Sequence, residues 1–196
     1  MSQPAVFLDR DGTMIHEVQF LRSFEDLTWF PSTIDAIRLL NRAGFVVCVT
    51  TNQSGVGRGL YSEDDVRLIH TRMADALSAA RARVDAWFYC PHHPDATVVT
   101  LRQVCECRKP RPGMIQSASS QFAIDVSRSF VVGDRLSDVD LAASAGARGI
   151  LVRTGYGENT IRENGGRAPG AAFVADNLMQ ATAWMIGERV RTEGAV

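Results

Sequence analysis

The chain has 196 residues, of which 45% are hydrophobic and 22% are charged, and its net charge is −1. This length favours one domain, which we expect to span residues 1–196 around a single core. A near-neutral charge gives no electrostatic attraction for nucleic acid or for an anionic membrane. The sequence has no apolar run of membrane-spanning length and no cleavable leader, so we expect a cytoplasmic protein.

Apolar runs alternate with amphipathic segments along the chain, which predicts an α/β fold. Strands are expected at residues 5–8, 45–50, 84–89, 129–132, 149–153 and 172–174. Helices are expected at residues 33–43, 62–83, 114–123, 137–145 and 177–190. Residues 13–30 are expected to form a short flap over the sheet edge, and residues 154–170 show no clear period. The predicted architecture is a Rossmann-like three-layer sandwich with a mainly parallel sheet.

Several residues are typical of helix ends. Ser32 and Asp35 form an approximate capping box, and Gly44 is expected to stop that helix. Gly146 is expected to end the helix at 137–145, and Asp176 is expected to cap the last one.

The first strand ends in Asp9-Arg10-Asp11-Gly12-Thr13. Two carboxylates crowded at a sheet edge repel each other, and a divalent cation relieves that repulsion. Taken alone, these acids indicate a metal-binding site no more strongly than they indicate an acidic turn or helix cap after a strand.

Polar residues also follow three later strands, and each group is short. They are Thr51 and Asn52, Lys109, and the pair Asp134 and Asp138. The carboxyl ends of parallel strands lie on one edge of a sheet, where open α/β folds bind ligands. These groups are therefore expected to converge with Asp9 and Asp11.

Together the four groups resemble the haloacid dehalogenase superfamily of phosphohydrolases. The matching motifs occur in order over nearly the whole chain: Asp9-x-Asp11-Gly12-Thr13, Thr51-Asn52 after a strand, Arg108-Lys109-Pro110, and Gly133-Asp134-x-x-x-Asp138. The resemblance implies an aspartyl-phosphate formed on Asp9, with Asp11 as general acid and base.

The same resemblance implies roles for the remaining polar residues. Thr51 and Asn52 are expected to donate hydrogen bonds to phosphate oxygens, and Lys109 is expected to supply fixed positive charge. Mg²⁺ is expected on the side chains of Asp9 and Asp134 and the backbone carbonyl of Asp11. Asp138 is expected either to orient water or Lys109, or to act as a favourable acid in the first turn of a helix.

Three of the four cysteines lie close to a histidine in the sequence. Cys90-x-His92 and Cys105-x-Cys107 enclose residues 93–104. Three thiolates and an imidazole match a closed, tetrahedral structural Zn²⁺ site. We therefore expect a zinc-binding insertion over about residues 90–107, which we call the Cys/His loop, although unconnected loop cysteines remain the alternative.

Two further expectations concern these cysteines and histidines. His93 is the rival to His92 as the zinc ligand, and Cys48 is expected to be a buried core thiol. Because Cys107 directly precedes Arg108 and Lys109, the zinc is expected to hold both cations at the catalytic edge.

The flap and the Cys/His loop are too short to form a cap domain, so the site is expected to be essentially capless. The Cys/His loop and the segments 51–59 and 152–155 resemble the zinc-containing branch of histidinol-phosphate and heptose bisphosphate phosphatases, and favour its heptose members. The implied reaction removes the 7-phosphate of D-glycero-D-manno-heptose 1,7-bisphosphate. The residues expected to bind this substrate are Asn52, Gln53, Ser54, Arg108 and Lys109.

Arg108 is the best candidate for the second phosphate, since its guanidinium fork matches that anion. Arg58 and His16 are weaker candidates. Histidinol-phosphate phosphatase, polynucleotide 3′-phosphatase and a catalytically silent, zinc-stabilised binding module are the alternatives. A monomer is expected, because no heptad or large apolar stripe is evident.

Overall fold

The computed structural model describes residues 2–193, and a six-stranded parallel sheet forms its centre. The strand order is β3-β2-β1-β4-β5-β6. The strands are β1 (Ala5–Leu8), β2 (Val46–Asn52), β3 (Ala86–Cys90), β4 (Phe130–Gly133), β5 (Arg148–Val152) and β6 (Phe173–Ala175). Every neighbouring pair is parallel, which confirms the predicted α/β class.

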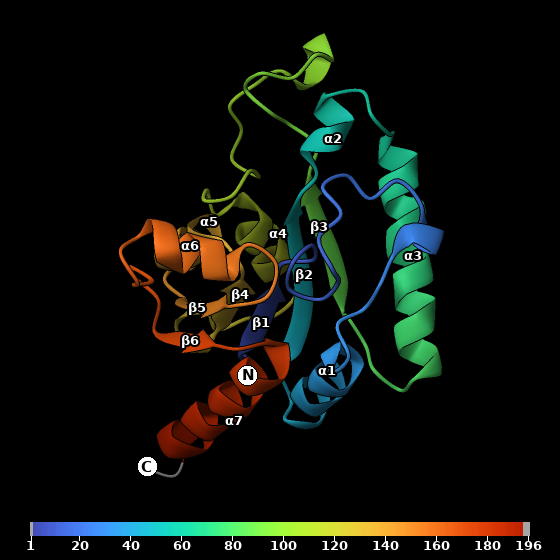
Figure 1. Cartoon of the computed structure of the whole chain (residues 1–196). Helices are drawn as coiled ribbons and strands as arrows, with labels where there is room; N and C mark the ends of the chain where they lie inside the picture. Colours follow the sequence, from blue (N-terminus) through green and yellow to red (C-terminus); the bar gives the residue numbers. More distant parts are fainter. Residues whose placement is uncertain (1, 194–196) are drawn as a thin grey trace.

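Helices cover both faces of this sheet and complete a three-layer sandwich (Figure 1). They are α1 (Thr33–Arg42), α2 (Ser54–Gly57), α3 (Glu63–Ala79), α4 (Gly113–Gln121), α5 (Leu136–Ala145), α6 (Gly157–Glu163) and α7 (Leu178–Glu193). Buried side chains of α1, α3 and α7 pack on one face, and those of α4 and α5 pack on the other. In the described part of the chain, no helix is long and apolar enough to cross a membrane.

The central strand shows why the predicted strands are unbroken apolar runs. All four residues of β1 are buried. Val6 and Leu8 join the core beneath α1 and α7, whereas Ala5 and Phe7 join the core beneath α4 and α5. A strand covered on both faces has no solvent side, so polar residues do not alternate along it.

Two predicted helix caps are wrong. Ser32 makes no side-chain capping bond, since its ψ of 4° is not the extended backbone that a capping side chain needs. Asp35 pairs with Arg38 instead, with Oδ1 and Nη1 2.7 Å apart. At the last helix, the side chain of Asn177 rather than Asp176 accepts the N–H of Gln180, at 3.1 Å.

The helix that follows Ser62 ends four residues before its predicted end, at Ala79. Arg81 adopts a left-handed backbone, with φ of 59°. The N–H groups of Arg81 and Ala82 donate to the carbonyls of Ser78 and Leu77, at 2.9 Å each. This pair of bonds closes a helix in the way a glycine usually does. The sequence carries no glycine there to mark the end.

Two short helices, α2 and α6, lie where the sequence predicts no helix. They contain four and seven residues, which is too short to establish a helical period in the sequence. α2 directly follows Gln53 at the end of β2, so it sets the direction in which the chain leaves the sheet edge.

Candidate active site

The site lies at the carboxyl edge of the sheet, where the strand order reverses between β1 and β4. Asp9 follows β1, and its N–H donates to the carbonyl of Val132 in β4 at 2.8 Å. A cleft of about 590 Å³ opens here. Its lining includes Asp9, Asp11, Thr51, Asn52, Gln53, Ser54, Arg58, Arg108 and Lys109. The structure therefore brings the predicted residues of three separate strand ends to one cleft.

Lys109 is the buried centre of this cleft. Its Nζ lies 2.6 Å from Asp9 Oδ1 and 2.6 Å from Asp138 Oδ1, and it donates to the carbonyl of Thr50 at 3.0 Å. Burial alone would lower the pKa of Lys109, but Asp138 and Asp9 outweigh burial and raise it. The ammonium group therefore stays charged and is held between two carboxylates.

Asn52 holds the backbone of Lys109. Its Oδ1 accepts the N–H of Lys109 at 3.1 Å, and its Nδ2 donates to the carbonyl of Lys109 at 3.3 Å. The sequence predicts a direct contact of Asn52 with phosphate. In the structure one amide N–H and the amide oxygen position Lys109, and the phosphate contact stays a prediction.

Three carboxylates surround this lysine: the oxygens of Asp9, Asp134 and Asp138 lie within 4.8 Å of one another. Asp134 Oδ2 accepts the N–H of Tyr156 at 2.7 Å, whereas its Oδ1 is buried without a hydrogen-bond partner in the part of the chain that the structure describes. Burial raises the pKa of Asp9 well above its ordinary value and raises that of Asp134 to about 7.

Three ionised carboxylates carry more charge than one lysine balances, and their mutual repulsion adds to burial in raising the pKa values of Asp9 and Asp134; a bound cation relieves that repulsion. The donors of this cluster are hard oxygens, which Mg²⁺ prefers. The residues at this position, including the unpaired oxygen of Asp134, therefore fit the magnesium ion that the sequence predicts.

Gly12 allows the turn after β1 to approach Asp134. Its φ is +83°, and a Cβ placed on it would lie 2.1 Å from Asp134 Oδ2. Any side chain here would therefore displace that carboxylate, and an L-residue would also be strained at this φ. The glycine of the first motif is required by packing against the fourth motif.

Asp11 is held by its neighbours on the cleft wall. Its carboxylate accepts hydrogen bonds from Arg10 and from Gln53 Nε2, the latter at 2.9 Å. Gln53 Nε2 also donates to Thr51 Oγ1 at 2.9 Å, and Gln53 Oε1 accepts from Tyr61 Oη at 2.9 Å and from Arg10 at 3.1 Å. Gln53 was expected to bind substrate, but its amide uses both N–H groups and its oxygen within this network.

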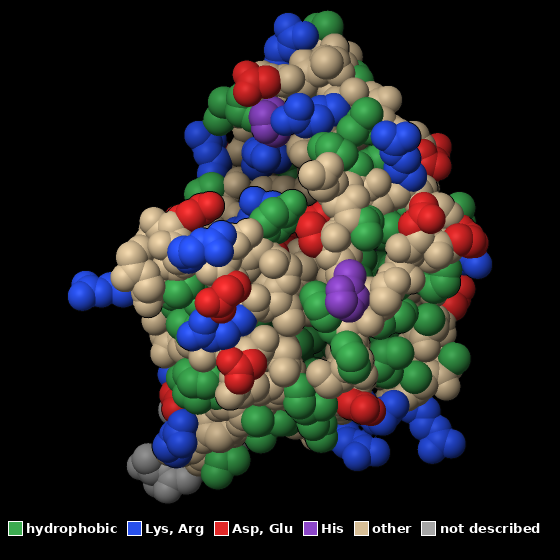
Figure 2. Space-filling view, viewed as in Figure 1, with side chains coloured by type: hydrophobic (Ala, Val, Ile, Leu, Met, Phe, Trp, Pro, Cys, Tyr) green, Lys and Arg blue, Asp and Glu red, His purple; other side chains and the backbone are tan. Residues whose placement is uncertain are grey.

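Arginines surround the open side of the cleft. Figure 2 shows blue side chains gathered around a hollow beside the Cys/His loop, and since the single lysine of the chain is buried, these are arginines. Arg108 is half-buried, and its Nη1 donates to the carbonyl of His92 at 3.0 Å. Arg58 is exposed, and the Arg135 guanidinium lies 3.9 Å from the ring centroid of Tyr156.

Sequence reasoning missed Arg135, Tyr156, Tyr61 and Arg10, which all line the cleft. Arg10 and Arg135 each directly follow a motif aspartate, so their positions carried a usable signal. His16, by contrast, is exposed, contacts the Phe30 ring at a tilt of 37° with centroids 4.1 Å apart, and is absent from the cleft lining.

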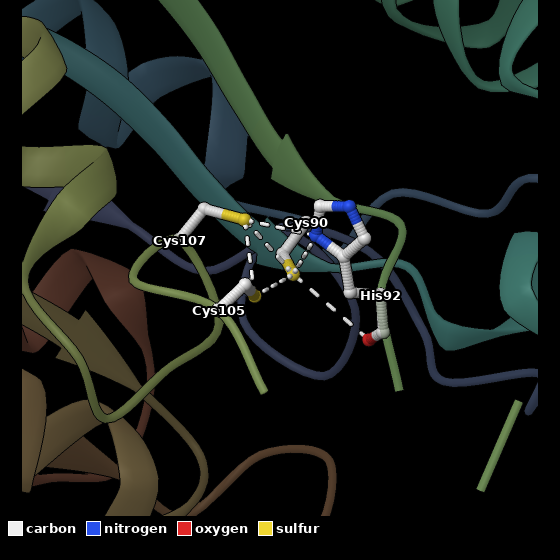
Figure 3. A group of neighbouring side chains, drawn as sticks. All are labelled: Cys90, His92, Cys105 and Cys107. Carbon is white, nitrogen blue, oxygen red and sulfur yellow. Dashed lines mark hydrogen bonds between the residues drawn. The ribbon is translucent and has the colours of Figure 1, made fainter. Parts of the chain in front are cut away.

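The Cys/His loop brings its four predicted ligands together (Figure 3). Cys90 Sγ lies 3.5 Å from Cys105 Sγ and 3.2 Å from Cys107 Sγ, and the Sγ atoms of Cys105 and Cys107 are 3.3 Å apart. His92 Nδ1 lies 3.7 Å from Cys90 Sγ and 3.3 Å from Cys107 Sγ. Tetrahedral Zn²⁺ with ordinary bond lengths separates such ligands by about 3.5–3.8 Å. The separations here, 3.2–3.7 Å, are at or slightly below that range, so the four residues can hold this ion after shifts of a few tenths of an ångström.

His93, the alternative to His92 as a zinc ligand, lies outside the cluster. His93 Nδ1 accepts the N–H of Asp95 at 3.0 Å, and this residue is not part of the four-residue cluster. Cys48 is fully buried in the core beneath α4 and α5, far along the chain from the Cys/His loop.

The chain is similar to known phosphatases over most of its length. A D-glycero-beta-D-manno-heptose-1,7-bisphosphate 7-phosphatase of Rhodopseudomonas palustris is 48% identical over 148 residues, which cover 76% of this chain and 82% of that protein. The chain belongs to the heptose bisphosphate phosphatase family. A second member, the D-glycero-D-manno-heptose-1,7-bisphosphate 7-phosphatase of Thermosynechococcus vestitus, is 40% identical over 189 residues, covering 94% of this chain and 96% of that protein.

The wider superfamily and the fold agree with this family. A family model described as HAD-hydrolase-like matches residues 106–181. The crystal structure of a D,D-heptose 1,7-bisphosphate phosphatase from B. bronchiseptica, complexed with magnesium and phosphate, superposes with a TM-score of 0.84 at 35% identity. The match covers 95% of this chain and 99% of that chain. The haloacid dehalogenase resemblance predicted from the four motifs is therefore confirmed.

Proposed function

We propose that this heptose bisphosphate phosphatase family member removes the 7-phosphate of D-glycero-D-manno-heptose 1,7-bisphosphate in a Mg²⁺-dependent reaction. The observation that carries this proposal is the convergence of Asp9, Asp11 and Lys109 in one cleft, with the carboxylate of Asp134 behind them. A nucleophile, an acid and fixed positive charge are the groups that phosphoryl transfer needs.

Asp9 is the proposed nucleophile. Lys109 binds its Oδ1, so the other carboxylate oxygen is available to attack phosphorus and form an aspartyl-phosphate. A Mg²⁺ ion held by the Asp9 and Asp134 side chains and the Asp11 backbone carbonyl would neutralise charge on the transferring group. Because Asp138 holds the other side of Lys109, the ammonium group keeps its place as charge develops on the phosphate oxygens.

Asp11 is the proposed acid and base. It protonates the leaving alkoxide oxygen, and the resulting carboxylate then takes a proton from the water that hydrolyses the intermediate. Thr51 Oγ1 already accepts a hydrogen bond from Gln53. The hydroxyl proton of Thr51 is therefore left to donate to a phosphate oxygen.

The open, arginine-rich side of the cleft suits a substrate with a second anionic group. Arg108 is the proposed ligand of the unreacting phosphate, because the His92 carbonyl holds its guanidinium beside the cleft. Arg58 and Arg135 add positive charge nearby, and Ser54 adds a hydroxyl to the same wall.

A structural Zn²⁺ on the Cys/His loop, bound by Cys90, His92, Cys105 and Cys107, completes the proposal. The ion joins the end of β3 to the segment that carries Arg108 and Lys109, which lowers the ordering cost of both cations. We further propose that the protein works as a cytoplasmic monomer.

The deciding experiment compares phosphate release from both anomers of the heptose bisphosphate with release from histidinol phosphate, in Mg²⁺. We expect a clear preference for one heptose bisphosphate anomer and no release by Asp9→Asn. A preference for histidinol phosphate would refute the substrate, and normal turnover by Asp9→Asn would refute the nucleophile.

A further inference from the structure

Arg10, between the two aspartates of the first motif, is only 1% exposed. Its Nε donates to Asp11 Oδ2 at 3.1 Å, and its Nη2 donates to Asp11 Oδ1 at 3.0 Å. Nη2 also donates to Gln53 Oε1 at 3.1 Å. An arginine is rarely buried this completely unless its donors are used, and here they converge on the neighbouring carboxylate.

This contact constrains Asp11 more than a single hydrogen bond does. A planar guanidinium fork bound to both oxygens fixes the plane of a carboxylate as well as its position. Gln53 Nε2 adds a third donor at 2.9 Å from Oδ2, and Tyr61 holds Gln53 from the other side. The carboxylate of Asp11 is therefore oriented by two side chains that are themselves held.

His70 supports Arg10 from the opposite direction. Its Nε2 lies 3.2 Å from Arg10 Nη1, and since arginine can only donate, Nε2 is the acceptor and the imidazole is neutral. Burial, with a further effect of Arg10, lowers the pKa of His70 to about 3. The ring stacks on Trp87 with centroids 4.8 Å apart, so α3 and β3 together fix the position of this acceptor.

We propose that Arg10, supported by His70, is a positioning residue that orients the Asp11 carboxylate for proton transfer to the leaving oxygen. The inference rests on the proposed acid–base role of Asp11. It predicts that Arg10 matters in proportion to how much the leaving group needs a proton. A role limited to folding would reduce the active fraction of enzyme and lower the rates with all substrates equally.

The test compares two substrates in the Mg²⁺-loaded enzyme. The alkoxide leaving group of the heptose bisphosphate needs protonation, whereas 4-nitrophenyl phosphate releases a stable phenolate. The ratio kcat/KM reports the step up to phosphoryl transfer, before the shared hydrolysis of the intermediate. For Arg10→Met we expect kcat/KM to fall about 10- to 100-fold more for the heptose substrate than for the aryl phosphate.

His70 provides a matched pair if Arg10→Met does not fold. Both His70→Leu and His70→Gln remove the stack on Trp87, but only glutamine restores an acceptor for Arg10 Nη1. For His70→Leu we expect kcat/KM to fall more with the heptose substrate than with 4-nitrophenyl phosphate. For His70→Gln we expect the ratio of the two kcat/KM values to stay near that of the wild-type enzyme. Arg148→Met is the control, because Arg148 is the first residue of β5 and so lies at the amino ends of the strands, away from the active site at their carboxyl ends.

Asp11→Asn separates this inference from the function on which it depends. Suppose that Asp11→Asn lowers kcat/KM selectively for the heptose substrate. If Arg10→Met and His70→Leu then lower kcat/KM equally for both substrates, Arg10 is only structural. If Asp11→Asn itself lowers kcat/KM equally for both substrates, Asp11 is not the acid, and the inference about Arg10 fails with it.

Discussion

Lys109 Nζ lies 2.6 Å from Asp9 Oδ1, although 100 positions separate the two residues in the chain. Both residues are more than nine-tenths buried, so this contact is shielded from solvent. Asp138 holds the ammonium from the other side, and Asn52 holds its backbone. The ion pair is therefore supported by Asn52 at the end of β2 and by Asp138 in α5, the helix that follows β4.

Replacing Lys109 tests whether its charge is needed. Lys109→Met should lower kcat by about 100-fold or more, because the fixed cation nearest the nucleophile is lost. Lys109→Arg should recover little, since a planar guanidinium does not match a site built around a compact ammonium. Steady-state kinetics with Arg111→Met as control checks this, as Arg111 pairs with Glu106 at the protein surface. Near-normal kcat in Lys109→Met would exclude the role.

Arg108 should act on binding rather than on chemistry. Arg108→Met should raise KM for the heptose bisphosphate about tenfold or more, as expected for losing a charged hydrogen bond to a phosphate. The same variant should leave KM for heptose 7-phosphate nearly unchanged, because that compound lacks the second phosphate. Arg111→Met again serves as the matched arginine control. Equal effects on both substrates would show that Arg108 does not bind the second phosphate.

The sequence predicts the catalytic cluster because strand ends are a strong signal. Asp9, Thr51 and Asp134 each lie at the carboxyl end of an apolar strand, and parallel pairing brings such ends to one edge. The Cys/His cluster is predicted for a similar reason, since residue type and spacing alone determine which side chains can share one ion.

The sequence does not predict which partner each polar side chain selects. Asn52 and Gln53 are both expected to contact substrate, and the sequence gives no sign that Asn52 also holds Lys109 and Gln53 also holds Asp11. An amide can donate and accept in many directions, and the direction here depends on how the Cys/His loop and α2 pack. Arg10 and His70 meet for a similar reason, because the long Arg10 side chain reaches from the turn after β1 to α3, 60 positions along the chain.

Asp138 shows that two alternative interpretations can both describe one residue. Its Oδ1 holds Lys109, as expected of an acid that orients the cation. Its Oδ2 accepts the N–H of Arg135 at 3.2 Å at the start of α5, as expected of an acid in the first turn of a helix.

Removing zinc should displace the Lys109 ammonium group from the active site. Cys107→Ser should lower the zinc content and reduce kcat about tenfold or more, because the segment carrying Lys109 loses its anchor. Lys109 is the only lysine in the chain, so selective ¹⁵N-lysine labelling gives one side-chain ammonium signal to follow. We expect that signal to shift or broaden in the variant and on chelation.

The matched control for the zinc prediction is Cys48→Ala. Cys48 is buried in the core and is not part of the cluster, so this variant should keep its zinc and its Lys109 signal. Zinc-free protein with normal kcat and an unchanged ammonium signal would show that the Cys/His loop does not position Lys109.

His70 should make the stability of the protein depend on pH. Its pKa is lowered from 6.5 to about 3, chiefly by burial, so the unfolded chain binds a proton in this range that the folded protein does not. The stabilisation is complete above pH 6.5 and is lost as the pH falls toward 3. Between pH 6.5 and pH 5 the wild-type protein should lose about 1.6 kcal/mol relative to His70→Gln, because the slope approaches 1.36 kcal/mol per pH unit only below the unfolded pKa. Urea unfolding of both proteins at each pH measures this difference, with His16→Gln, which removes an exposed ring, as the control. Parallel pH profiles for wild type and His70→Gln would contradict a neutral, buried His70 behind Arg10.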